Sequence, residues 1–95
     1  MHIGILTLDV NLPWCESLKN KRAFIKPLII RLHNEFNVSV SESGKQESLT
    51  SSSILCVEVC TDRIHIEQDF NKIITFLLSN FTDIDILSHS TEFFY

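Results

Sequence analysis

The sequence contains little of the two residues that most often interrupt regular structure, with only two Gly and two Pro. A chain so poor in both is not a collagen-like repeat and lacks the composition of a disordered linker. It also has no apolar run near the roughly 20 residues that span a bilayer. No basic region precedes the first apolar run, so no signal peptide is predicted. We therefore expect a cytoplasmic protein that does not enter the membrane.

Cysteine is scarce as well, and its spacing argues against two common roles. The three Cys residues are an odd number and include no Cys-x-x-Cys pair, so they predict neither a disulfide framework nor a zinc knuckle. The four His residues are scattered, and no two of them have a close ligand spacing. The sequence therefore predicts reduced thiols, no metal site and no cofactor.

Positive charge is sparse in most of the chain. The net charge is −4 at pH 7, with Lys and Arg concentrated in residues 1–34 and Asp and Glu in residues 35–95. Most of the surface would therefore repel a nucleic acid, and only a local basic patch remains as a candidate anion contact.

The pattern of apolar residues predicts six elements in one domain spanning residues 1–95. Strands are expected at 1–12, 36–42, 53–60 and from 83 to about 89, and helices at 18–36 and 63–80. Ser17 and Asp62 are the expected N-caps. This β-α-β-β-α-β order, with right-handed crossovers, predicts an α+β ferredoxin-like sandwich. Two helices would cover one face of a four-stranded antiparallel sheet with the strand order 4-1-3-2.

Side-chain alternation assigns the two faces of this predicted sheet. The helix-facing side is expected to carry Leu6, Leu8, Val10, Val38, Val40, Leu55, Val57 and Val59. The open side is expected to carry Ile3, Ile5, Thr7, Ser39, Ile54, Cys56, Glu58 and Cys60. We interpret the apolar members Ile3, Ile5, Ile54 and Cys56 as a partner or homodimer face. The alternative is that the Ser-rich hairpin loop 43–52 or the aromatic end 93–95 covers this side.

The first predicted helix carries the basic patch. At about 100° per residue, Lys19, Arg22, Lys26 and His33 share one face, and Lys21 flanks it. These side chains could bind the phosphates of RNA or another anion, whereas the alternative is a solvated helix face. Pro27 lies in mid-helix, where it either bends or breaks the helix.

Trp14 lies in the loop just before this helix. Its ring could stack on a base beside the basic patch or anchor a partner, and the alternative is a lid over the edge of the core. By contrast, the open sheet side offers no aromatic ring on the first or third strand, so base stacking there is not expected.

Several segments resemble a known family: MHIG at residues 1–4, SLKNKR at 17–22, the Lys-Pro-Leu step at 26–28, and FNVSVSE at 36–42. Together they resemble the YlxP-like family, a bacterial domain-of-unknown-function family numbered 503. The sequence departs from the family at Leu49-Thr50, where a Trp-Gln pair is usual. The resemblance implies a ferredoxin-like fold and no established enzyme activity. Family genes often lie beside genes for translation initiation and ribosome maturation, which implies association with the ribosome or its RNA.

We therefore expect a non-enzymatic binding module. Its expected partner is ribosomal RNA or a ribosomal subunit, and the alternative partner is a second copy of the chain, bound through the open sheet face.

Overall fold

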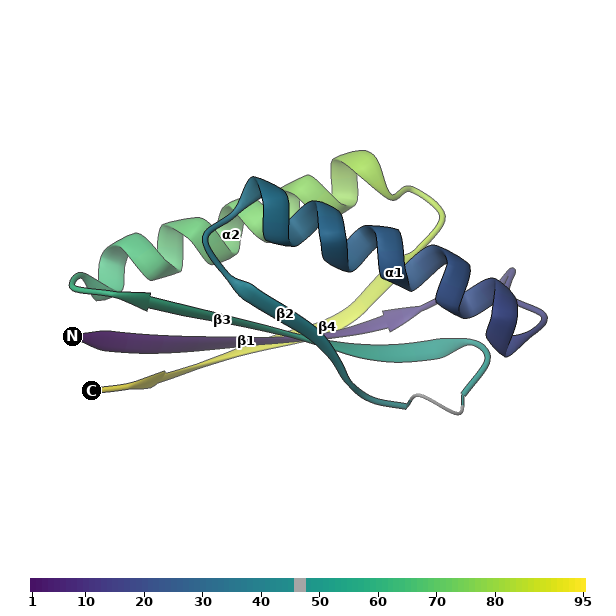
Figure 1. The fold of residues 1–95 in the computed structure, drawn as a ribbon, viewed down its shortest axis with the longest axis horizontal. Coiled ribbons are helices and arrows are strands. Elements are labelled where there is room, and N and C mark those ends of the chain that lie inside the picture. Colours follow the sequence, from purple (N-terminus) through teal and green to yellow (C-terminus); the bar gives the residue numbers. More distant parts are fainter. Residues whose placement is uncertain (46–47) are drawn as a thin grey trace.

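The computed structural model describes residues 1–45 and 48–95. Its elements are, in order, β1 (His2–Asn11), α1 (Leu18–Glu35), β2 (Ser39–Gly44), β3 (Ser51–Cys60), α2 (Arg63–Asn80) and β4 (Asp85–Phe94). The strands form one antiparallel sheet in the order β2-β3-β1-β4. Both helices lie on the same face of this sheet (Figure 1). The predicted ferredoxin-like sandwich and its strand order are confirmed.

Capping residues explain where the two helices begin. The Ser17 hydroxyl accepts a hydrogen bond of 3.0 Å from the backbone N–H three residues later. The Asp62 carboxylate accepts one of 3.0 Å from the N–H two residues later. Each bond satisfies one of the amide donors that have no partner within the first helical turn. Both predicted N-caps are confirmed.

Pro27 lies inside α1 without breaking it. The proline ring removes the donor for the carbonyl of Ala23, four residues earlier, and both residues are exposed. Water can therefore take the place of the missing amide, and the helix continues to Glu35. In the described residues, no helix combines the length and the hydropathy needed to cross a bilayer.

The core forms between β1 and the two helices. Leu6, Leu8 and Val10 on β1 have no exposed surface. The helices cover them with a buried set consisting of Ile25, Leu28 and Leu32 from α1 and Ile66, Phe70, Ile73 and Leu77 from α2. The helix α2 comes especially close to β1 at Gly4. A Cβ atom at that position would overlap the Ile66 Cγ2 methyl group and lie 3.1 Å from Phe70 Cε2.

The predicted faces of β3 are wrong. Ile54 and Cys56 are fully buried beneath the helices, whereas Leu55 and Val57 lie on the open side and Val59 is 53% exposed. The register with β1 explains the reversal, because directly opposed residues of antiparallel strands share a face. Leu6 opposes Cys56, and Leu8 opposes Ile54. Because both faces of β3 are apolar, alternation alone did not distinguish them.

The other strands differ from the prediction at their ends. β2 begins at Ser39 and extends to Gly44, so the connection to β3 is shorter than the predicted loop 43–52; residues 46–47 of that loop lie outside the described residues. β4 extends to Phe94, which pairs with Ile3 of β1. The aromatic end is therefore a strand end, and it places Phe94 on the open face of the sheet.

Candidate functional site

Three of the predicted anion-binding side chains lie exposed on one face of α1. Lys19, Arg22 and Lys26 are all exposed, and the spacing of three and four residues aligns them along the helix. With about 1.5 Å of rise per residue, they span roughly 10 Å of the helix axis. The structure therefore brings these three cations together as the sequence predicted.

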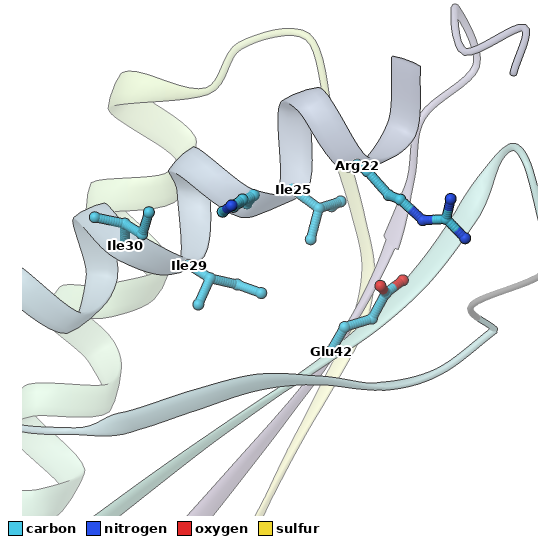
Figure 2. Close-up of a pocket in the computed structure, with 6 residues that line it drawn as sticks. Arg22, Ile25, Ile29, Ile30 and Glu42 are labelled. Atoms are coloured by element: carbon cyan, nitrogen blue, oxygen red, sulfur yellow. The ribbon is translucent and has the colours of Figure 1, made fainter. Parts of the chain in front are cut away.

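A groove of about 300 Å³ lies between this part of α1 and the edge strand β2. Its lining consists of Arg22, Ile25, Lys26, Ile29, Ile30 and Glu42. Figure 2 shows Arg22 and Glu42 pointing toward each other from α1 and β2, with Ile25 and Ile29 directed into the space between these elements. The groove therefore combines an apolar lining with charged groups at its rim.

Lys21 is not part of the exposed patch. Its side chain is 2% exposed, and its ammonium group lies 3.1 Å from Glu42 Oε2. It also donates to the carbonyl oxygens of Lys45, at 2.6 Å, and Ser48, at 2.8 Å. The prediction that Lys21 contacts an external anion is therefore not supported by its position, because its donors are used inside the protein. Through these contacts Lys21 holds the β2–β3 connection against α1.

The side chains of His33 and Trp14 also make their contacts within the protein. The Nδ1 atom of His33 lies 2.9 Å from the carbonyl oxygen of Val38, so the imidazole donates there. The Trp14 indole N–H donates to the carbonyl of Asp83 at 2.8 Å. Its ring meets the ring of Phe24 edge-on at 5.0 Å.

Trp14 consequently lies away from the cationic face. Phe24 follows Arg22 by two residues and is rotated from it by about 200° around the helix. Trp14 is 40% exposed, but it covers the core edge on the other side of α1. The structure therefore does not bring the predicted stacking residue together with the predicted phosphate contacts.

The open face of the sheet carries an apolar patch near the chain ends. Ile3 and Ile5 lie there as predicted, and the register places Val59 opposite Ile3 and Val57 opposite Ile5. Phe94 of β4 extends the patch and is 47% exposed. The predicted members Ile54 and Cys56 point to the opposite face and are buried. We call the group Ile3, Ile5, Val57, Val59 and Phe94 the open-face patch.

The other end of the open face is polar. Asp9 accepts hydrogen bonds of 2.5 Å from Ser53 and 3.1 Å from Ser88, and it pairs with Lys45 at 3.4 Å. The two hydroxyl hydrogen bonds, with the nearby Lys45, lower the pKa of the Asp9 carboxyl from its usual value. This network confines the apolar part of the open face to the end where the chain termini lie (Figure 1).

The fold also assembles a cluster that the sequence did not predict. One ligand atom each from Glu58, His65 and Asp69 lies within 4.8 Å of the others. Glu58 comes from β3, whereas the other two residues lie one turn apart on α2. Burial, with the Asp69 carboxyl as a neighbour, raises the pKa of Glu58 to about 7. The His-x-x-x-Asp spacing was the only sequence signal, and it does not identify a third residue from another element.

Comparison with known proteins identifies the family. A family model described as "Protein of unknown function (DUF503)" matches residues 3–91. The chain belongs to the DUF503 family. A DUF503 relative, "Uncharacterized protein YlxP" from Bacillus subtilis (strain 168), is 35% identical over 78 residues, which are 82% of this chain and 84% of that protein. The predicted membership of the YlxP-like family is therefore confirmed.

Two solved structures align with this DUF503 chain over nearly its whole length. The de novo designed protein Foldit4 aligns over 100% of this chain and 98% of its own, with a TM-score of 0.55 and 11% identity. The cofactor-independent oxygenase SnoaB from Streptomyces nogalater aligns over 99% and 91%, with a TM-score of 0.48 and 8% identity. The designed protein shares the fold alone, and the similarity to SnoaB carries no inference about this chain.

Proposed function

We propose that this protein is a non-enzymatic, cytoplasmic binding module that contacts ribosomal RNA through Lys19, Arg22 and Lys26 on α1. The observation that carries the proposal is the alignment of these three exposed cations on one face of α1, beginning with Lys19 in its first turn. All four residues of the first turn of α1, Leu18–Lys21, are described by the structure, and none of them is acidic. A helix N-terminus already carries partial positive charge, so cations placed there reduce helix stability but strengthen attraction for an anion.

The groove beside these cations supports RNA over a simple anion. An unstacked base has an apolar face and polar edges, and the Ile25, Ile29 and Ile30 side chains offer an apolar surface for it. Arg22 and Lys26 at the rim would then hold the adjoining phosphates. The neighbourhood of family genes to translation genes favours the ribosome as the source of that RNA, and the three free cysteines fit a reducing compartment.

The proposal is tested by co-sedimentation of the protein with purified small and large ribosomal subunits. Three phosphate contacts predict a salt slope of about −2 to −3, so affinity should fall roughly 40- to 130-fold between about 50 and 300 mM salt. The triple variant Lys19→Gln, Arg22→Gln and Lys26→Gln should bind at least about 10-fold more weakly at low salt. Its remaining binding should depend little on salt.

A matched control removes the effect of net charge. Asn71→Glu, Lys72→Gln and Thr75→Glu together change the net charge by the same amount at three exposed positions of α2. This control should bind like the wild type. Equal binding by the wild type and the α1 triple variant, or no binding of the wild type to either subunit at low salt, would overturn the proposal.

The open-face patch supports a second candidate function, self-association. The five members of the patch are uncharged, but the exposed Glu92 opposes Ile5 on the same face, so a two-fold contact would have to leave this carboxylate at its rim. Val59 and Phe94 are each about half exposed, and a contact of this kind would remove that surface from water. In this reading the protein is a dimeric interaction module.

A further inference from the structure

The cluster of Glu58, His65 and Asp69 joins the first turns of α2 to the underlying strand β3. His65 Nε2 lies 3.3 Å from Asp69 Oδ2, and the two side chains are 58% and 17% exposed. Glu58 is only 2% exposed, and its oxygens reach the same point from the sheet side. One edge of the cluster is therefore open to solvent and the other is closed by the protein.

Glu58 is poorly accommodated as a bare carboxylate. Both of its oxygens are buried, and neither has a hydrogen-bond partner among the described residues. An ionised carboxylate at this position loses its hydration without gaining a hydrogen-bond donor. The neighbouring Asp69 carboxylate adds like-charge repulsion. A proton shared between Glu58 and Asp69 would leave one negative charge in the cluster, whereas a bound divalent cation would neutralise both carboxylates.

We propose that Glu58, His65 and Asp69 bind one divalent transition-metal ion of the Zn²⁺ class. One imidazole nitrogen and two carboxylate groups form a mixed ligand set that suits Zn²⁺, whereas Mg²⁺ and Ca²⁺ favour oxygen ligands throughout. Because His65 faces solvent, the remaining coordination position is left to water or to a small ligand. The sequence spacing predicted no metal site, since the ligands come from two elements. The inference is independent of RNA binding by α1.

Metal binding would strengthen the attachment of α2 to the sheet. Metal ions that bind only the folded state stabilise it, because the ligands are not gathered in the unfolded chain. Zn²⁺ should therefore raise the melting temperature of the metal-free protein, and a chelator should reverse the increase. Mg²⁺ at the same concentration should have no such effect.

The direct test is a calorimetric titration of the tag-free, chelator-treated full chain with Zn²⁺. The expected result is saturable binding of one ion per chain. Glu58→Gln and His65→Gln should each weaken binding at least about 10-fold, because each removes one of three ligands. His65 is exposed, so its replacement keeps the test decisive even if the Glu58 variant fails to fold.

Three control variants locate the site. Glu67→Gln changes an exposed carboxylate on α2, His89→Gln changes an exposed imidazole on β4, and Cys60→Ser removes the free thiol two residues from Glu58. All three should bind Zn²⁺ like the wild type. The proposal is overturned if the wild type shows no saturable uptake up to about 1 mM, if His65→Gln binds normally, or if Cys60→Ser abolishes binding.

Discussion

At the residue scale, Lys21 shows that the position of a charge along a helix decides its role. Lysine is rarely buried fully unless it is paired, and here the ammonium group meets Glu42 and two backbone carbonyls. Its spacing from Ile25 and Leu28 is the spacing of the core stripe, so the helical period already placed it on the buried side. Because Lys21 is charged, it was predicted to lie beside the exposed basic patch. The helical period alone would have predicted its burial correctly.

Replacing Lys21 with Met tests this internal role. The variant keeps an apolar stem but removes the donor for the Lys45 and Ser48 carbonyls and the partner of the Glu42 carboxylate. We expect the free energy of unfolding to fall by about 2–4 kcal/mol in urea titrations. Lys19→Met, at an exposed position two residues earlier, should change it by less than about 0.5 kcal/mol. Equal stability of the two variants would contradict the role given to Lys21.

At the element scale, the fold depends on how closely α2 approaches β1. Gly4 lies beneath Ile66 and Phe70, and any larger residue would meet them. The same packing brings His65 and Asp69 over Glu58, since these residues belong to the turns of α2 nearest that strand pair. The close approach at Gly4 thus helps to position the proposed metal site.

Gly4→Ala tests this contact. The added methyl group would overlap Ile66 Cγ2, so the helix or the strand must shift, at a cost of about 1–3 kcal/mol in the free energy of unfolding. The matched control is Gly44→Ala in β2, where a Cβ would lie at an ordinary 3.7 Å from Ser53 Cβ. Chemical denaturation should show a loss at position 4 and little change at position 44. A neutral Gly4→Ala variant would contradict the close approach.

The elements also show how far the sequence alone could predict the structure. The helices were predictable because cap residues and the helical period both act within a few residues along the chain, as at Ser17 and Asp62. The faces of β3 were not, because Ile54 and Leu55 are equally apolar and only pairing with β1 distinguishes them. The alignment of Lys19, Arg22 and Lys26 on one face of α1 was predictable, because it depends only on the period of a single helix. The Glu58 cluster depends on register and packing together, which no local pattern contains.

At the scale of the whole molecule, the two faces of the sheet have different environments. Both helices cover one face, and the other carries the open-face patch at one end and the Asp9 network at the other (Figure 1). An uncovered apolar surface of this kind is typical of an interaction site.

Val59→Asp tests whether a second copy covers the patch. If it does, the wild type should sediment as a dimer at about 100 µM, and the variant should be a monomer with an unchanged far-UV circular dichroism spectrum, because a charge buried in the contact opposes association. Ser41→Asp adds the same charge on the open face but at an exposed position opposite Leu55, outside the patch. It should remain dimeric in analytical ultracentrifugation. A monomeric wild type would exclude self-association.

The position of β1 in the sheet has a consequence for synthesis. β1 is made before both of its neighbours in the sheet, since β3 and β4 follow it in the chain. Until residues 85–94 have left the ribosome, β1 has an unpaired edge, and pairs as distant as Ile3 and Phe94 cannot form. Contacts between such distant residues close slowly. The nascent chain therefore exposes a hydrophobic strand edge until β4 has been made, a state that favours chaperone binding or premature association.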